Sequence, residues 1–348
     1  MEKPLKSLVA PLLFAFSQIA CAASAQLPTF KDEPAVIQFA QEMHERHGFD
    51  AHDLLEQFAQ VRPNNKVLQL IKPPSSPTQR SWERYRPRFL NDKRIDGGVR
   101  FWQENRAKLA QARATYGVPE EIIVAIIGVE TEYGRNMGGF RVLEALATLA
   151  FNYPPRAEFF RTELEQFLLL TRENSLDPLT VKGSFAGAIG IPQFMPGSQR
   201  RYAVDFDGDQ RVDLSGSFDD AIGSVGHFLE QHGWQAGQPI AVPAITSGTP
   251  DAALIQAGIR PSLKVGELAE KGIRAEIDPE ATAALIDLVS PGRETEYWLG
   301  FDNFYVITRY NRSSFYAMSV FQLAEEIRSR MCARQATTAT NREKYCRA

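Results

Sequence analysis

An apolar helix in the middle of the chain carries a carboxylate on its buried face. In the run PEEIIVAIIGVETEYGR, residues 119–135, the side chains of Ile122, Ile126 and Glu130 recur every four residues and share one stripe of a helix. Because that stripe is isoleucine-rich, it must face a core, and Glu130 enters the core with it. Glu132 points to the opposite side, where we expect it to be solvated.

The position of Glu130 has two interpretations. Burial without a neighbouring cation disfavours the charged carboxylate, so we expect the pKa of Glu130 to be raised. A carboxylic acid that stays protonated near neutral pH can protonate a glycosidic oxygen as a general acid. The alternative is a glutamate that only ends the helix through a hydrogen bond.

A glycine-rich segment downstream supplies a second unusual pattern. Residues 182–198 read KGSFAGAIGIPQFMPGS, in which four glycines let the backbone approach another group closely. Gln193 is polar among apolar neighbours and needs a hydrogen-bond partner, from the protein or from a ligand. Taken alone, the segment is equally compatible with a tight structural turn between helices.

Together, the two segments resemble the catalytic signature of the membrane-bound lytic murein transglycosylase B family (family 3 lytic transglycosylases). In that family the glutamate precedes a short aromatic-Gly-Arg segment and, later, the motif GSFAGAxGxxQFMPxS. Both stand here, at 130–135 and 183–198. The resemblance covers the chain from about Tyr85 to Phe321. Further matches follow in the same order, at 151–158, 307–311 and 315–318.

The resemblance implies an enzyme and a mechanism. The reaction would cleave the β-1,4 bond between N-acetylmuramic acid and N-acetylglucosamine in peptidoglycan and form a 1,6-anhydromuramoyl product without consuming water. Glu130 would act first as acid and then as base, and Tyr310 is the candidate for polarising the substrate's acetamido group. Ordinary glycosidases use two carboxylates, and no local motif supplies a partner for Glu130. The positions that match the family's substrate contacts are Tyr85, Arg156, Ser184, Gln193, Phe194, Met195, Tyr310, Asn311 and Tyr316.

Two other functions remain open at this point. A hydrolytic muramidase would need water and a second carboxylate close to Glu130. A calcium-stabilised peptidoglycan-binding scaffold would bind without turnover, with Glu130 purely structural. Peptidoglycan glycan strands are the expected partner in each case, other cell-wall enzymes are candidate partners, and a monomer is expected. The formal net charge of −3 at pH 7 gives no sign of nucleic-acid binding.

Alternating aspartates predict a calcium loop. Asp205, Asp207, Asp209 and Asp213 occupy positions 1, 3, 5 and 9 of an EF-hand pattern, and position 7 would use its backbone carbonyl. The pattern is incomplete, because Gln210 replaces the glycine of position 6 and position 12 is not Glu. The resemblance implies that an Asp at the start of the next helix closes the site; the alternative is a solvated turn with that Asp as a helix cap. The expected set for a structural Ca²⁺ is Asp205, Asp207, Asp209, Arg211 and Asp219, with no organic cofactor.

The N-terminus has the pattern of a secretory signal peptide. Lys3 and Lys6 precede an uncharged apolar run that is too short to span a membrane, and residues 23–25 (ASA) fit the cleavage rule. We therefore expect a soluble protein in the periplasm of a Gram-negative bacterium. The alternative is an outer-membrane lipoprotein anchored through Cys21, although Gln18 stands where such signals carry Leu.

The roughly 320 residues after the signal peptide (1–25) are too many for one small core. We expect a predominantly helical α+β fold, and the resemblance implies a lysozyme-like catalytic core. The two remaining cysteines, Cys332 and Cys346, should form a disulfide in an oxidising compartment. The expected units are an N-terminal helical subdomain (26–116), the catalytic core with the calcium loop (117–237), a small β-containing subdomain (238–303), and a return to the core with a disulfide-closed tail (304–348). Strands are expected at 285–289, 295–299 and 304–308, and helices include 34–47, 50–61, 81–90, 98–116, 141–149, 157–171, 219–232 and 314–331.

Overall fold

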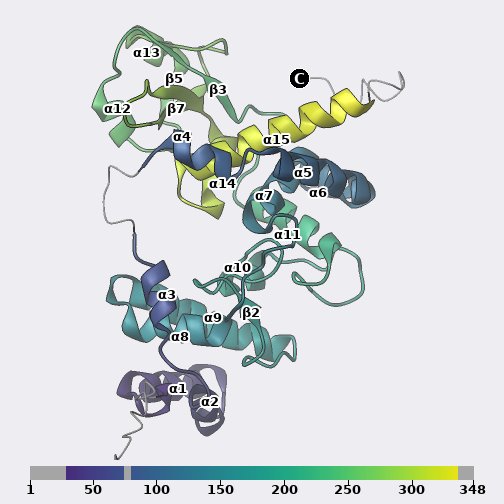
Figure 1. Ribbon diagram of the computed structural model, residues 1–348, viewed down its shortest axis with the longest axis vertical. Helices are drawn as coiled ribbons and strands as arrows, with labels where there is room; N and C mark the ends of the chain where they lie inside the picture. Colours follow the sequence, from purple (N-terminus) through teal and green to yellow (C-terminus); the bar gives the residue numbers. More distant parts are fainter. Residues whose placement is uncertain (1–28, 74–79, 336–348) are drawn as a thin grey trace, which may run out of the picture.

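The computed structural model describes residues 29–73 and 80–335 (Figure 1). Helices make up most of this part of the chain, and three small antiparallel sheets are set among them. The predicted signal peptide, Cys21 and Cys346 lie outside the described residues. Cys332 lies in the last helix and is disulfide-bonded. None of the described helices is long and apolar enough to cross a membrane.

The first helices of the chain pack on a helix pair from its middle, at one end of the molecule (Figure 1). Phe151 meets the rings of Phe30, Phe39 and Phe58 at centroid distances of 6.0, 5.9 and 6.4 Å, which joins the two segments through one aromatic cluster. The elements are η1 (Phe30–Asp32), α1 (Pro34–His47), α2 (Ala51–Phe58), α3 (Asn65–Leu70), α8 (Val142–Asn152), η4 (Pro154–Arg156) and α9 (Ala157–Glu173).

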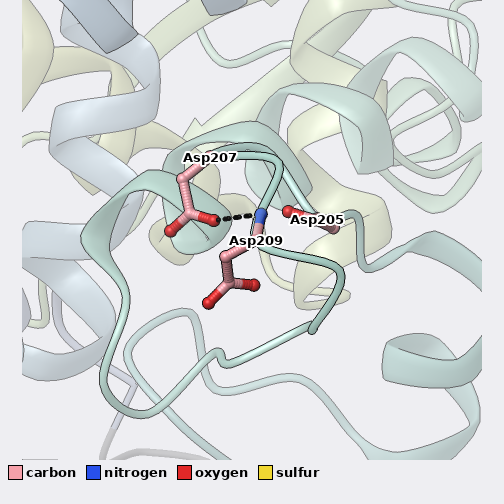
Figure 2. A group of neighbouring side chains, drawn as sticks. All are labelled: Asp205, Asp207 and Asp209. Carbon is pink, nitrogen blue, oxygen red and sulfur yellow. Dashed lines mark hydrogen bonds between the residues drawn. The ribbon is translucent and has the colours of Figure 1, made fainter.

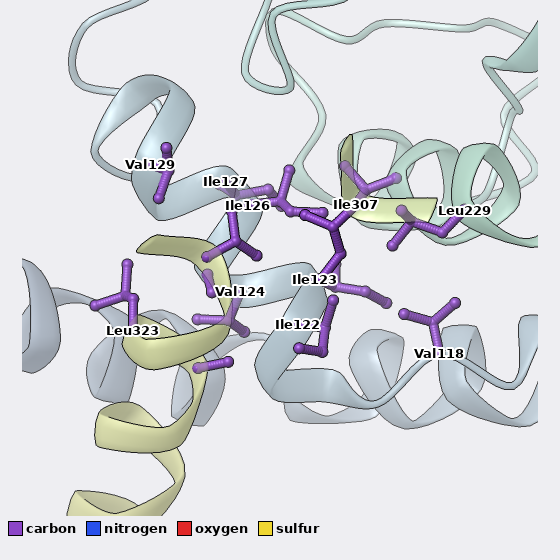
Figure 3. Packing of buried hydrophobic residues seen from close by; sticks show 14 of the residues in the cluster. Val118, Ile122, Ile123, Val124, Ile126, Ile127, Val129, Leu229, Ile307 and Leu323 are labelled. Carbon is purple, nitrogen blue, oxygen red and sulfur yellow. The ribbon is translucent and has the colours of Figure 1, made fainter. Parts of the chain in front are cut away.

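A second helical bundle surrounds α7 (Glu120–Thr131), the helix that carries Glu130. Its side chains from Ile122 to Val129 are all buried, in contact with neighbours on every side (Figure 3). A helix that is apolar all round is stable only inside a fold. The elements in contact with α7 are α5 (Asp92–Glu104), α6 (Arg106–Tyr116), α11 (Phe218–Gln231) and α15 (Ser314–Gln335). The same region of the fold contains α4 (Trp82–Tyr85), η3 (Arg86–Arg88), α10 (Pro196–Tyr202) and α14 (Asp302–Tyr310).

A small β-containing unit follows α11. Its main sheet has the antiparallel order β3-β8-β7-β5, with Leu285 opposite Leu299 at its centre. The strands expected at 285–289 and 295–299 are confirmed at 285–288 in β7 and at 296–299 in β8. The elements are β3 (Ala241–Pro243), β4 (Ile245–Thr246), α12 (Ala252–Gln256), β5 (Leu263–Lys264), α13 (Val265–Glu270), β6 (Ile273–Arg274), β7 (Thr282–Leu288) and β8 (Glu296–Gly300). A separate two-stranded pair, β1 (Phe140–Arg141) with β2 (Lys182–Gly183), lies beside the glycine-rich segment.

The strand expected at 304–308 is wrong, because this segment is part of helix α14. A short apolar run does not by itself distinguish a strand from a buried helix. The start of α14 is fixed by Asn303, which is 1% exposed and donates to the backbone carbonyls of Gln235 and Gln238. Phe304, Ile307 and their neighbours then face the core with helical spacing.

The helix expected at 98–116 is also divided, into α5 and α6. Asn105 lies between them with a non-helical backbone (φ −109°, ψ 22°), and its side-chain amide donates to the carbonyl of Phe101 at the end of α5. The buried side chains of the expected N-terminal unit belong to two clusters. Those of 30–67 pack with α8 and α9, whereas those from Trp82 onward pack around α7.

Candidate active site

Glu130 occupies the last turn of α7, and an unusual turn follows it. Glu132 and Tyr133 both have left-handed backbones, with φ of 53° and 63°. The ring of Tyr133 fills a space left by glycines on two helices: a Cβ on Gly97, Gly98 or Gly128 would lie 2.7, 2.6 or 2.5 Å from the Tyr133 side chain. Its hydroxyl donates to the carbonyl of Arg94 at 2.8 Å. The packing and hydrogen bond of Tyr133 therefore fix the end of α7 against α5.

Glu130 as a whole residue is half-buried. Burial raises its pKa to about 7, and a hydrogen bond from the hydroxyl of Tyr316, 2.6 Å from Oε1, acts in the opposite direction. The upward shift is the direction expected from the sequence. Across the described residues, no second carboxylate and no cation contributes to this pKa. Glu130 can therefore hold its proton near neutral pH.

Tyrosines form the wall beside Glu130. Tyr310 and Tyr316 are stacked, with ring centroids 6.5 Å apart and planes 13° apart. The hydroxyl of Tyr310 donates to the carbonyl of Pro192 at 2.8 Å, which connects this wall to the glycine-rich segment. Tyr85 packs on Phe315. Burial is the main cause of the raised pKa of Tyr85, and the negative charge of Glu130 is the second cause. The structure therefore gathers Tyr85, Tyr310 and Tyr316 around the acid.

The glycine-rich segment presents Gln193 in a left-handed conformation, with φ of 54°. Its amide nitrogen donates to the carbonyls of Gly190 and Met137 at 2.9 and 3.1 Å, and among the described residues the amide oxygen keeps its acceptor capacity for a ligand. Ser184 accepts from the backbone of Ala188 and shapes the turn that precedes it.

The other expected substrate contacts lie in different surroundings. Phe194 is 2% exposed and belongs to the core, so its ring supports the segment and is not an exposed sugar platform. Met195 is half-buried against the cluster of α8 and α9. Arg156 is exposed over the ring of Phe159 at 4.3 Å, and Asn311 is exposed at the end of α14.

Glu132 differs from the expectation of a solvated side chain. Its side chain is 11% exposed and pairs with Lys93 at 2.7 Å, and it also accepts from Asn136. The left-handed backbone at this position turns the side chain toward α5, which helical spacing alone does not anticipate.

The aspartate loop brings three of its predicted ligands together. One carboxylate oxygen from each of Asp205, Asp207 and Asp209 lies within 4.8 Å of the others (Figure 2). Gln210, at the position where the EF-hand pattern has glycine, has φ of 70°, the left-handed conformation that glycine adopts most easily. Backbone amides of Gly208 and Gln210 donate to Asp205, which folds the loop around the carboxylates.

The remaining predicted ligands do not join this group. Asp219 pairs with Lys108 at 3.2 Å, and the carboxylate of Asp213 accepts from the backbone amides of Ser215 and Gly216. Asp220, which the sequence did not single out, is 1% exposed and accepts from the amides of Phe206 and Asp213, so it holds both ends of the loop. Three oxygen ligands at this separation suit a hard cation such as Ca²⁺.

A cavity of about 590 Å³ lies between the aspartate loop and the end of α9. Its lining includes Arg211, Leu176 and Lys182, but not Glu130. This cavity is therefore separate from the surroundings of Glu130.

Comparison with known proteins agrees with this site. The family model of the transglycosylase SLT domain matches residues 31–325. Membrane-bound lytic murein transglycosylase B of Escherichia coli (strain K12) is 44% identical over 311 residues, which cover 86% of this chain and 84% of the relative. The fold and the buried acid therefore define a lysozyme-like transglycosylase that acts on peptidoglycan.

Two solved structures add ligands to the comparison. The Escherichia coli lytic transglycosylase Slt35 in complex with calcium has a TM-score of 0.79 and 42% identity, over 88% of this chain and 96% of that one. SltB3 of Pseudomonas aeruginosa in complex with NAG-anhNAM-pentapeptide has a TM-score of 0.72 and 30% identity, over 84% and 78%. The chain belongs to the membrane-bound lytic murein transglycosylase B family, as the motifs indicated. It is an enzyme, a peptidoglycan lytic transglycosylase.

Proposed function

We propose that the protein cleaves the β-1,4 bond between N-acetylmuramic acid and N-acetylglucosamine and forms a 1,6-anhydromuramoyl product, with Glu130 as the single acid and base. The observation that carries the proposal is the environment of Glu130. Its pKa is about 7, it accepts from Tyr316, and no second carboxylate acts on it in the described part of the chain. A two-carboxylate glycosidase would place a second acid close by.

In the first step, protonated Glu130 donates its proton to the glycosidic oxygen as the bond to C1 breaks. The carboxylate that remains is stabilised by the hydrogen bond from Tyr316. The positive charge that develops at C1 is met by the substrate's own acetamido oxygen. Tyr310 lies beside Tyr316. Its hydroxyl group donates to the carbonyl of Pro192, and the lone pairs of the hydroxyl oxygen can still accept from the acetamido N–H.

In the second step, the same carboxylate removes the proton of the muramoyl 6-hydroxyl. The oxygen attacks C1, the 1,6-anhydro ring closes, and Glu130 is again protonated. The proton lost in the first step is recovered in the second, so no water is consumed. The ligand bound to the related SltB3, NAG-anhNAM-pentapeptide, has the chemistry of such a product and supports this proposal.

Glu130→Gln tests the role of the acid. The amide preserves the shape of the side chain but has no proton to transfer, so turnover should be lost while glycan binding remains. Product formation from isolated peptidoglycan and binding to glycan strands would be measured in parallel. Glu132→Gln is the matched control, because it lies two residues away on the same turn and should remain active. If Glu130→Gln cleaves like the wild type, Glu130 is not the catalyst.

We also propose that the aspartate loop holds a structural Ca²⁺. Asp205, Asp207 and Asp209 would supply carboxylate oxygens and Arg211 its backbone carbonyl. Asp219 can complete the set only if its carboxylate leaves Lys108. The calcium complex of the related Slt35 supports this assignment. Bound there, the ion would neutralise the mutual repulsion of the three carboxylates.

The place of action proposed for the enzyme is the periplasm. The charged, apolar and small-residue regions of residues 1–25 support export, and peptidoglycan lies outside the cytoplasmic membrane. Residue Cys21 leaves a lipoprotein form as the alternative.

A further inference from the structure

Thr131 lies directly after the catalytic glutamate and is completely buried. Its hydroxyl lies 2.8 Å from the carbonyl oxygen of Ile191 and 3.4 Å from that of Ile127 in its own helix. The shorter distance identifies Ile191 as the acceptor of its proton. The hydroxyl oxygen of Thr131 also accepts from the backbone amide of Gly134 at 3.0 Å. One hydroxyl therefore connects the end of α7, the turn that follows it, and the glycine-rich segment.

The segment held by Thr131 is also fixed on its other sides. The amide of Ile191 donates to the carbonyl of Leu214 at 2.8 Å, so the backbone of this residue is held between the catalytic helix and the end of the aspartate loop. Gly190 must be glycine here, because it has φ of 74° and a Cβ would lie 2.5 Å from the oxygen of Leu214. Pro192 accepts from Tyr310, and Gln193 follows immediately.

We propose that Thr131 is a positioning residue, which sets the separation between the carboxyl of Glu130 and the substrate-facing groups that begin at Gln193. The inference rests on the proposed role of Glu130. Thr131 touches no substrate; it acts through Ile191. Because both groups must reach one sugar ring together, a small shift between α7 and the segment misaligns the acid with the bond that it protonates.

The hydroxyl, and not the volume of the side chain, carries this role. Valine has nearly the shape of threonine, so Thr131→Val keeps the packing but leaves the carbonyl of Ile191 and the amide of Gly134 without their partner. The segment would then move to find other partners. We expect kcat to fall by about 10- to 100-fold, with KM changed much less, because the contacts that bind the distant parts of the glycan remain.

The experiment compares Thr131→Val with Thr131→Ser on soluble glycan strands, together with thermal melting of each variant. Serine keeps the oxygen and should retain a kcat within a few-fold of the wild type. Thr171→Val is the matched control: Thr171 is 3% exposed, and its hydroxyl bonds only to Leu168 within α9. It should change melting without changing kcat.

If Thr131→Val does not fold, Thr131→Ala and Thr131→Ser are compared, since these variants differ by one oxygen atom. Equal kcat values for that pair, or a folded Thr131→Val with wild-type kcat, would overturn the inference. Glu130→Gln in the same assay separates the catalytic role of Glu130 from the positioning role of Thr131. Full activity of that variant removes the proposed catalyst, whereas its inactivity beside a fully active Thr131→Val removes only the role of Thr131.

Discussion

At the residue scale, the proposed mechanism requires one carboxyl group to act both as an acid and as a base. The group must hold a proton near neutral pH and then accept another. The apolar packing of α7 meets the first demand by raising the pKa of Glu130 to about 7. Tyr316 meets the second, because its hydroxyl donates to the carboxylate that forms. The opposing directions of these two effects keep the pKa close to the pH at which both forms are available.

The raised pKa makes Glu130 a source of instability at alkaline pH. Its folded pKa of about 7 exceeds the ordinary value of 4.5, so its contribution to stability is complete below pH 4.5 and is lost as the pH rises through 7. Glu130→Gln should therefore be more stable than the wild type at pH 8, by up to about 3 kcal/mol, and not at pH 4.5. Denaturant unfolding at the two pH values measures this. An equal difference at both would show that the glutamate is not selectively destabilised when charged.

The functional residues divide into those that a local pattern reveals and those that it does not. Glu130 was predictable because its spacing from Ile122 and Ile126 is local. Thr131 and Tyr133 were missed, since their roles depend on Ile191 and on glycines of α5, which are distant in sequence. Gly97 and Gly98 together were the available signal, because adjacent glycines inside a helix indicate a close neighbour.

At the scale of elements, the aspartate loop is tied to the catalytic segment by its last residues. Leu214 is 1% exposed, and its carbonyl accepts from Ile191, while Asp220 holds the loop at both ends. The three neighbouring carboxylates of the loop repel one another, and a bound cation would remove that repulsion. The order of the loop should therefore depend on calcium.

Asp209→Ala tests that dependence. Without this ligand the melting temperature should fall when calcium is present and should no longer change when a chelator is added. Melting of the wild type and the variant, each with calcium and with chelator, measures both effects. Glu270→Ala is the control, because this carboxylate is exposed on α13, away from the loop. Identical melting of the wild type in calcium and in chelator would count against the site.

The backbone of the loop offers an independent prediction. Gln210 has φ of 70°, where a side chain is disfavoured by roughly 1–2 kcal/mol relative to the right-handed region. Gln210→Gly should therefore stabilise the protein by about 0.5–1 kcal/mol, after the extra entropy of glycine in the unfolded chain is subtracted. Gln210→Ala, which retains a Cβ, should give no such gain. Chemical denaturation measures the free energy of unfolding of both variants. An equal increase in Gln210→Ala and Gln210→Gly would show that the left-handed backbone is not the cause.

At the scale of the whole molecule, the site forms where segments far apart in sequence converge on α7. Glu130 lies near the middle of the chain and the glycine-rich segment at 182–198. Tyr85 comes from far upstream, and Tyr310 and Tyr316 come from the C-terminal part of the chain. The helical class and the strands β7 and β8 were predictable from periodicity. Helix α14 was not, because Asn303 starts it through bonds to residues 235 and 238.

The first helices of the chain also pack on a segment that is distant in sequence, so the order of the elements did not predict which unit they belong to. Helices α1 to α3 precede α4 by only a short connection but bury their side chains against α8 and α9. The spacing of apolar residues within a helix does not predict its packing partner. Here the partner is set by the aromatic cluster around Phe151.

Mass spectrometry of the reaction product distinguishes a lytic transglycosylase from a hydrolytic muramidase. Purified protein without residues 1–25, the proposed signal peptide, would be incubated with isolated peptidoglycan, beside an active control muramidase. The account predicts muropeptides with anhydro ends, one water lighter than the products of hydrolysis. Reducing-end products would contradict it and would require a second carboxylate near Glu130, and intact glycan beside an active control would contradict turnover itself.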